Sequence, residues 1–252
     1  NLDILENDNL FPRVRDENPI EALKDRKSAL SEAYLSLETA LRFSTPEGMP
    51  TSLLVTSTRP AEGKSTSSFA IAATLARLGY RTLLIDADMR SPSQHEMLSL
   101  SNERGLSEVL SGNATIDKLL QDTGYENLKL LPAGRNPPNA AELLSGVHMD
   151  ETIRDAQSLF DVEIVDAPPV MGLADAPLIA SKAAGTLMII EANGTRSRQA
   201  QVALKRLRGA RANVLGAVLT KFEAKRAQFG YGYDYGYGYG NDRSESDAHP
   251  VL

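Results

Sequence analysis

Apolar residues gather along the chain in short, nearly continuous runs, which alternate with stretches of helical periodicity. The runs predict six strands, at residues 53–56, 82–85, 128–131, 162–165, 186–191 and 214–220. Nearly continuous apolar strands are typical of a sheet that is covered on both faces. Between the strands, helices are predicted at residues 67–78, 141–144, 174–180 and 197–207. This alternation indicates βαβ units, so we expect an α/β fold with a doubly wound, mostly parallel sheet flanked by helices.

The two ends of the chain lack this alternation. Residues 1–19 are polar and without periodicity, which predicts a leader or linker. Residues 20–43 have apolar side chains at helical spacing, which predicts one long amphipathic helix or two joined near Ser28. The last segment, residues 229–252, begins FGYGYDYGYGYG, and alternating glycine cannot hold a helix or fill a core. We therefore expect an N-terminal helical extension, a domain over residues 20–228 and a disordered Tyr-rich tail.

Composition narrows the possible functions. The net charge of −6 argues against a nucleic-acid-binding protein, which needs a concentrated basic surface. The absence of cysteine excludes disulfides, thiolate metal sites and a thiol nucleophile. The three histidines, His95, His148 and His249, do not stand at metal-ligand spacing. No apolar run reaches the roughly 18–20 residues that a membrane-spanning helix needs.

One loop has the pattern of a phosphate-binding site. The sequence VTSTRPAEGKST at residues 55–66 follows a predicted strand and precedes a helix, which is the setting of a P-loop. Backbone N–H groups and the helix N-terminus would bind phosphate. Thr58 replaces the usual first glycine, and a chance GKST sequence in a Ser-rich turn is the alternative. The predicted ATP-binding residues are Pro60, Ala61, Glu62, Gly63, Lys64, Ser65 and Thr66.

Carboxylates follow two of the predicted strands. Asp86 and Asp88 come after residues 82–85, and Asp166 comes after residues 162–165. Ligands of parallel α/β sheets bind at the carboxyl ends of strands, where these side chains should meet. Asp166 is therefore predicted to hold Mg²⁺ through water. The alternative for each aspartate is a helix cap.

Together these motifs resemble the bacterial tyrosine kinases (BY-kinases) of capsule and exopolysaccharide synthesis, which are relatives of the MinD/ParA ATPases. The resemblance implies an ATP-dependent protein-tyrosine kinase that uses ATP and Mg²⁺. Besides the P-loop and the Tyr-rich tail, it rests on DADMRSPSQHEML (86–98), GLSEVLSG (105–112), PAGRNPPNAAELLSG (132–146) and VDAPPVMGLADA (165–176).

The resemblance also implies roles for individual residues. Lys64, Ser65 and Thr66 would form Walker A, Asp86 and Asp88 would belong to Walker A′, and Asp166 would be Walker B. Asp86 would be the base, or at least the orienter, for the acceptor tyrosine hydroxyl. Ser65, Asp88 and Asp166 would hold Mg²⁺, partly through water. The expected catalytic residues are Lys64, Asp86, Asp88 and Asp166.

The tail tyrosines are expected to be autophosphorylated in trans. Each phosphate adds about −1.5 to −2 charges, so five would add on the order of −7 to −10, enough to break up an oligomer. The alternative for this segment is a weakly self-associating aromatic sequence. The expected sites are Tyr231, Tyr233, Tyr235, Tyr237 and Tyr239.

Partners and location also follow from the resemblance. It implies a membrane-spanning polysaccharide co-polymerase segment as activator, fused upstream or separate, and a tyrosine phosphatase. It implies a cytoplasmic protein at the inner face of the plasma membrane, held by its partner or by an N-terminal membrane region preceding residue 1. The kinase would regulate polymerisation and export of the polysaccharide.

Three departures from the family pattern bear on these expectations. The ring-forming motif E-x-x-R-x-x-R has Glu32 here, but Leu35 and Glu38 replace the arginines, so a homo-oligomer is possible and the ring is in doubt. Arg59 replaces a signature lysine, and we expect it to be solvated rather than to reach a neighbour's phosphate. Thr220 replaces an asparagine near the adenine, so base recognition would rest on backbone groups.

Three further interpretations follow from the sequence. The basic helix at residues 196–211 is expected to be a solvated face. A ParA/MinD-like switch ATPase without kinase activity is the alternative function. A non-catalytic module whose tail is phosphorylated by another kinase is the third.

Overall fold

The computed structural model describes residues 19–222. The predicted leader, except for Pro19, and the predicted tail with its five tyrosines lie outside this part of the chain. The predicted domain boundary after residue 228 lies outside it as well. Among the helices of residues 19–222, none combines the length and the apolar character that crossing a membrane requires.

A seven-stranded sheet forms the centre of the molecule, with strand order β3-β4-β2-β5-β1-β6-β7. All neighbouring strands are parallel except β3 and β4, which confirms the predicted mostly parallel sheet. The six predicted strands are present, and β3 is an additional two-residue edge strand. The strands are β1 (Ser52–Ser57), β2 (Thr82–Asp86), β3 (Gln121–Asp122), β4 (Leu128–Leu131), β5 (Val162–Asp166), β6 (Gly185–Glu191) and β7 (Val214–Thr220).

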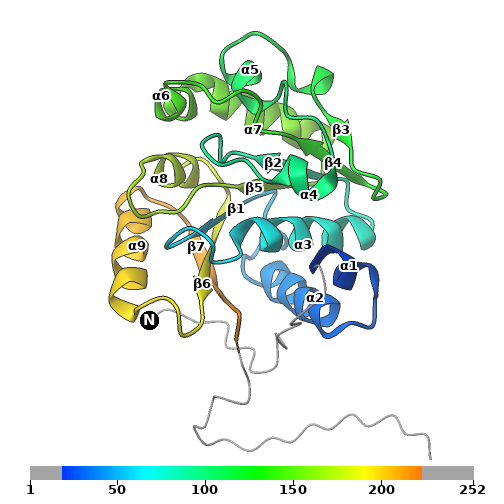
Figure 1. The fold of residues 1–252 in the computed structure, drawn as a ribbon, viewed down its shortest axis with the longest axis vertical. Coiled ribbons are helices and arrows are strands. Elements are labelled where there is room, and N and C mark those ends of the chain that lie inside the picture. Colours follow the sequence, from blue (N-terminus) through cyan, green and yellow to red (C-terminus); the bar gives the residue numbers. More distant parts are fainter. Residues whose placement is uncertain (1–18, 223–252) are drawn as a thin grey trace, which may run out of the picture.

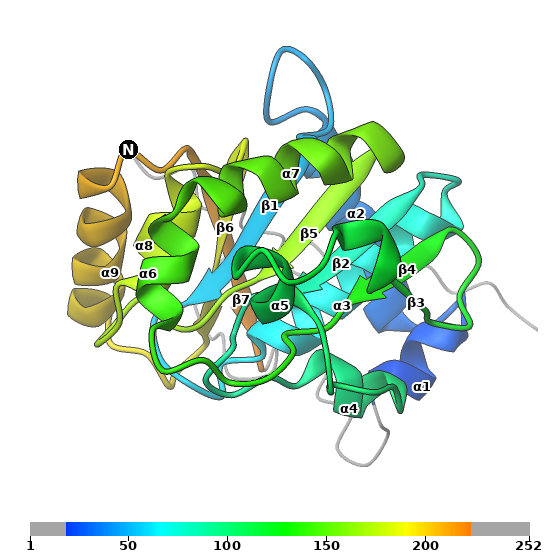
Figure 2. The ribbon, with the colours of Figure 1, turned by 90° about the horizontal axis from the view of Figure 1, so that it is seen from above.

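Helices cover both faces of this sheet (Figures 1 and 2). Helices α1, α2 and α3 pack on one face, and α5 to α9 supply apolar residues to the core on the other. Side chains of β1 alternate between the two cores, which is why its apolar run is continuous. The helices are α1 (Pro19–Lys24), α2 (Ala29–Arg42), α3 (Lys64–Arg77), α4 (Gln94–Leu98), α5 (Leu106–Leu110), η1 (Ile116–Lys118), α6 (Ala140–Ser145), α7 (Val147–Leu159), α8 (Asp175–Ala180) and α9 (Ser197–Gly209).

The N-terminal extension forms two helices that pack against α3, the helix that follows the phosphate loop. Ser28 ends the connection between α1 and α2 and caps α2, because its hydroxyl accepts a hydrogen bond from the N–H of Ser31 at 3.1 Å. Tyr34 of α2 donates a hydrogen bond of 3.0 Å to the hydroxyl of Ser67 in α3. Burial raises the pKa of Tyr34 to about 12, so its hydroxyl remains a donor at neutral pH. The two-helix alternative is thus confirmed.

Helix α7 is the largest element that the sequence pattern did not predict. Its buried side chains are Met149, Thr152, Ile153 and Ala156, which form a single stripe at helical spacing. Thr and Ala weaken the apolar signal of that stripe, so the periodicity is hard to recognise. The helix lies over the sheet at β5 and covers one of its faces.

Candidate active site

The carboxyl ends of β1, β2 and β5 meet at one edge of the sheet. In the parallel register, Asp86 lies opposite Asp166, and Val55 of β1 lies opposite Asp166 on its other side. The phosphate loop follows β1 and leads into α3. The structure therefore brings the predicted P-loop, Walker A′ and Walker B residues together.

The phosphate loop leaves the N-terminus of α3 open. Gly63 precedes the helix with φ of 89°, and no side chain caps it. Ala61 also lies in the left-handed region, with φ of 63°, whereas Thr58 does not, so the chain needs no glycine at that position. The first-turn N–H groups of a helix have no partners within the helix, and they attract anions.

Glu62 anchors the phosphate loop from within. Its side chain is completely buried, accepts a hydrogen bond of 3.0 Å from the N–H of Arg59 and contacts the hydroxyl of Thr195. Its carbonyl oxygen accepts a hydrogen bond of 2.6 Å from the hydroxyl of Thr220 at the end of β7. Thr220 therefore fastens the loop to the sheet.

The expectation that Arg59 is solvated is wrong. Its guanidinium donates to the carbonyl of Gly194 at 2.9 Å and lies 3.5 Å from carboxylate oxygens of Glu62 and Glu191. Two carboxylates and a carbonyl oxygen thus hold a cation that is about one-third exposed. Arg59 joins the phosphate loop to the segment that follows β6.

Lys64 points into the carboxylate cluster. Its Nζ lies 2.9 Å from Oδ2 of Asp88 and 3.4 Å from Oδ1 of Asp166, and it donates a hydrogen bond of 3.1 Å to the hydroxyl of Ser65. Burial alone would lower the pKa of Lys64, but the charges of Asp166 and Asp88 outweigh it and leave the pKa raised. The ammonium group therefore stays charged at neutral pH.

Asp86 binds backbone groups. Its Oδ2 accepts hydrogen bonds from the N–H groups of Ser93 at 2.9 Å and Gln94 at 3.0 Å, where α4 begins, and its Oδ1 accepts one from Asp88 at 3.2 Å. The side chain is completely buried. Burial and the charge of Asp166 raise the pKa of Asp86 to about 7. The helix-cap alternative therefore describes part of what this residue does.

Asp166 is held on both carboxylate oxygens. Its Oδ1 accepts a hydrogen bond of 3.2 Å from the hydroxyl of Ser68 and faces Lys64. Its Oδ2 accepts one of 2.7 Å from Nε2 of Gln94. Gln94 was not among the predicted site residues, and its position within the segment 86–98 was the sole sequence signal.

An ion pair fixes the segment that follows β2. Nε of Arg90 donates to Oδ2 of Asp175 at 2.8 Å, and its NH2 group donates to Oδ1 at 3.3 Å. Asp175 begins α8 and is 2% exposed. The pair connects the loop of Asp88 to the start of α8. The sequence motifs contained both residues without indicating that they meet.

The donor set suits Mg²⁺ and a polyphosphate. Within residues 19–222, no three acidic or histidine side chains form a complete metal site by themselves. Mg²⁺ prefers few carboxylates together with water and phosphate oxygens, and the hydroxyl of Ser65 with Asp88 and Asp166 offers such oxygen ligands. Lys64 and the uncapped helix N-terminus fit the phosphates.

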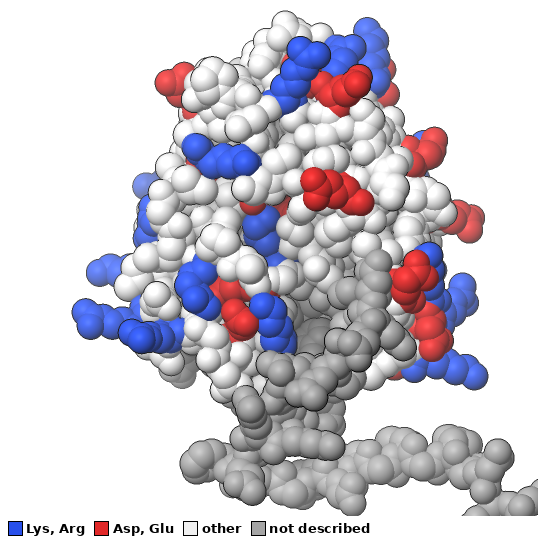
Figure 3. Space-filling model, in the orientation of Figure 1, with Lys and Arg blue, Asp and Glu red and all other residues white. Residues whose placement is uncertain are grey.

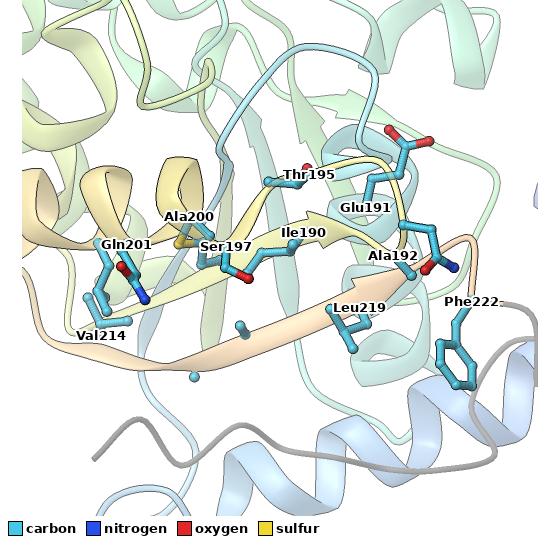
Figure 4. Close-up of a pocket in the computed structure, with 15 residues that line it drawn as sticks. Ile190, Glu191, Ala192, Thr195, Ser197, Ala200, Gln201, Val214, Leu219 and Phe222 are labelled. Carbon is cyan, nitrogen blue, oxygen red and sulfur yellow. The ribbon is translucent and has the colours of Figure 1, made fainter. Parts of the chain in front are cut away.

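An apolar groove of about 440 Å³ runs along β6, β7 and α9 (Figure 4). Ile190, Leu204 and Leu219 line it, and Phe222 lies at the end where β7 stops. Glu191 belongs to the same lining and, through its contact with Arg59, connects the groove to the phosphate loop. The sequence pattern did not predict this groove.

The basic helix α9 is mostly solvated, as expected. Lys and Arg side chains project from the lower left of Figure 3, where Figure 1 places α9. Arg198, Lys205 and Arg208 are exposed. Arg206 differs, because it donates hydrogen bonds to the carbonyl oxygens of Val170 at 2.9 Å and Leu173 at 3.1 Å. This arginine holds the loop after β5.

Comparison with known proteins gives consistent matches. A family model described as an AAA domain matches residues 55–198. The chain is 34% identical over 218 residues to tyrosine-protein kinase YwqD of Bacillus subtilis (strain 168), covering 86% of this chain and 92% of YwqD. It is 32% identical over 227 residues to tyrosine-protein kinase etk of Escherichia coli (strain K12), covering 88% of this chain and 31% of etk.

Two solved structures are similar over most of this chain. The kinase domain of Escherichia coli tyrosine kinase ETK superposes with a TM-score of 0.79 and 30% identity, over 89% of each chain. The chimerical protein CapA2B2 superposes with a TM-score of 0.76 and 28% identity, over 81% of this chain and 90% of that chain.

Proposed function

Since this chain belongs to the AAA-domain family and, within it, to the bacterial tyrosine-protein kinases, we propose that it uses Mg·ATP to phosphorylate the C-terminal tyrosines of another copy. Its activity is that of a protein-tyrosine kinase, as in its relatives. The observation that best supports the proposed site is the position of Lys64. This cation lies between Asp88 and Asp166, next to the open N-terminus of α3.

The proposed roles follow from these positions. Lys64 and the first-turn N–H groups of α3 bind and orient the phosphates. The hydroxyl of Ser65 and the carboxylates of Asp88 and Asp166 would hold Mg²⁺, partly through water. ATP would supply the phosphoryl group, and Mg²⁺ would neutralise its charge. The protein therefore contributes mainly alignment and electrostatic stabilisation.

The acceptor hydroxyl must lose its proton as its oxygen bonds to the γ-phosphorus and the bond to ADP breaks. A tyrosine hydroxyl has a pKa of about 10, so a nearby carboxylate can take that proton late in the transfer. We assign Asp86 to this role or to the orientation of the acceptor. Its position at the strand end beside Asp166 supports the first role, and its three backbone hydrogen bonds, which fix the carboxylate, support the second.

We also propose partners for this kinase. The similarity to one part of etk and to the CapA2B2 chimera supports a polysaccharide co-polymerase membrane segment as activator. A tyrosine phosphatase and a location at the inner face of the membrane complete the proposal. The position of Glu38 argues against a ring built through this motif, so a homo-oligomer would use other contacts. This side chain is buried and accepts hydrogen bonds from Nε of Arg42 at 2.9 Å and from its NH2 group at 2.5 Å.

The test is incubation of the purified full chain with Mg·ATP, beside a Lys64→Met control, followed by mass mapping of phosphorylated residues. Phosphate on the five tail tyrosines in the wild type alone is the expected result. ATP turnover without phosphotyrosine, even after addition of a candidate activator segment, would favour the switch-ATPase alternative. Equal tail phosphorylation of wild type and Lys64→Met in cells, where another kinase is present, would favour the non-catalytic module.

A further inference from the structure

Gln94 connects all three parts of the site. Its Nε2 donates hydrogen bonds to Oδ2 of Asp166 at 2.7 Å and to the carbonyl oxygen of Ser65 at 3.0 Å. Its backbone N–H donates to Oδ2 of Asp86 at 3.0 Å. The side chain is completely buried. One residue at the start of α4 thus joins the strand ends of β2 and β5 to the first turn of α3.

The carboxamide suits a position beside two buried carboxylates. Asp86 and Asp166 are register neighbours, and like charges so close repel each other. Lys64 and Ser68 face Oδ1 of Asp166, whereas Gln94 occupies Oδ2. An amide donates hydrogen bonds without adding charge, so it restrains the carboxylate and leaves its negative charge available to a cation.

The side-chain oxygen of Gln94 gives an independent indication that this residue has a role in the site. Oε1 of Gln94 is buried and has no hydrogen-bond partner within the described structure. An unsatisfied buried polar atom is unfavourable, and a residue chosen only for packing would avoid it. The contacts of the N–H₂ group therefore point to a role in the site.

We propose that Gln94 is a positioning residue, which fixes the Walker B carboxylate of Asp166 relative to Ser65 so that both face the Mg²⁺ of Mg·ATP. This inference rests on the proposed nucleotide site, and it does not require the tail tyrosines to be the acceptor. The two hydrogens of one N–H₂ group set the spacing, because one binds Ser65 and the other binds Asp166.

The experiment compares nucleotide binding by the wild-type chain and by Gln94→Met, a side chain of similar length without donors. A fluorescent ATP analogue is titrated in EDTA and then at a series of Mg²⁺ concentrations. In EDTA the two proteins should bind within about twofold, because the side chain of Gln94 does not contact Lys64. Mg²⁺ should increase the affinity for the ATP analogue. The Mg²⁺ concentration that gives half of this increase should rise about 10–100-fold in the variant. At saturating ATP and Mg²⁺, kcat should fall over a similar range, with little change in KM for ATP.

Two further variants control this measurement. Gln157→Met removes an amide of α7 that lies 3.4 Å from the hydroxyl of Thr51, before β1, and should leave the Mg²⁺ dependence unchanged. Gln94→Asn keeps the amide but is too short to reach both partners, so its defect should be smaller than that of Gln94→Met. It also keeps a donor at this position, should Gln94→Met fail to fold.

Several outcomes would overturn the inference: an unchanged Mg²⁺ dependence in folded Gln94→Met, an equal loss of affinity in EDTA, or a larger defect in Gln94→Asn than in Gln94→Met. The binding readout is separate from phosphotyrosine formation. Mg²⁺ could increase the ATP affinity of the wild type but not of Gln94→Met, while no tyrosine is modified. In that case Gln94 keeps its role and the proposed kinase reaction fails.

Discussion

Nζ of Lys64 lies 2.9 Å from Oδ2 of Asp88, so the lysine of the phosphate loop is paired with a carboxylate that follows another strand. Phosphate groups must therefore compete with Asp88 for this cation. The pairing connects two steps that are usually considered separately, the entry of the nucleotide and the assembly of the metal ligands.

Replacement of Asp88 by Asn should separate these steps. Without Mg²⁺, the variant should bind ATP about 3–10-fold more tightly, because one competing charge at Lys64 is gone. With Mg²⁺, tyrosine phosphorylation should fall about 10-fold or more, because an oxygen ligand of the proposed Mg²⁺ site loses its charge. Titration of an ATP analogue in EDTA and phosphotyrosine kinetics in Mg²⁺ measure the two effects.

Asp150→Asn is the matched control for this variant. It removes a similar pair with Lys182, at 2.5 Å between helix α7 and the segment after α8, and should change neither quantity. Weaker binding of Asp88→Asn in EDTA would contradict the proposed competition.

Thr220→Val tests how β7 holds the phosphate loop. The change removes the hydroxyl that donates to the carbonyl oxygen of Glu62 and keeps the shape of the side chain. We expect a loss of about 1 kcal/mol in the free energy of unfolding and a rise of about 3–10-fold in KM for ATP. Urea denaturation and initial-rate kinetics measure these changes.

Thr186→Val is the comparison for this substitution. Like Thr220, Thr186 is buried, but its hydroxyl has no hydrogen-bond partner in the described part of the chain. Its removal should leave stability unchanged or raise it by about 1 kcal/mol, with KM unaffected. Equal losses in the two variants would refute the specific role of Thr220.

Glu163 should make stability depend on pH. This residue of β5 is completely buried, both its carboxylate oxygens lack hydrogen-bond partners, and burial raises its pKa to about 8. The folded state thus binds the proton more tightly than the unfolded state does. Below its unfolded pKa the group makes no pH-dependent contribution, and stability falls as pH rises from about 4.5 to about 8.

Glu163→Gln removes this titration. The variant should be more stable than the wild type by on the order of 5 kcal/mol at pH 8.5, because the pKa of Glu163 moves from 4.5 to about 8 on folding and each pH unit is worth about 1.4 kcal/mol. At pH 5 the difference should be small. Denaturant unfolding of both proteins between pH 5 and pH 8.5 measures this difference. A difference in the free energy of unfolding that stayed constant with pH would contradict the prediction.

Arg90→Ala should destabilise the loop after β2. It leaves Asp175 buried without its bidentate partner, which we expect to cost about 1–3 kcal/mol, at the low end because Arg90 is partly exposed. The double variant with Asp175→Ala should lose less than the sum of the single losses. Arg81→Ala is the control, because its pair with Asp161 is exposed on both sides and its loss should change the free energy of unfolding little.

Much of the fold could be predicted because its physical causes are local in sequence. A strand that is buried on both faces favours a nearly continuous apolar run, and β1 and β6 show one. The sequence pattern did not predict helix α7, because Thr152 and Ala156 in its buried stripe give a weak apolar signal. Their burial follows from the position of the helix on the sheet. Glu163 lies inside a predicted strand, but its burial follows from the positions of neighbouring elements.

The sequence by itself determined the phosphate loop, the strand-end aspartates and the family resemblance, because fixed spacing along one segment generates that chemistry. The tertiary structure decided the partners of those groups. Arg59 contacts Gly194, and Gln94 contacts both Ser65 and Asp166. Such contacts join residues that are far apart in the chain. They arise from the parallel register that brings the carboxyl ends of β1, β2 and β5 to one edge, and a sequence pattern does not contain that register.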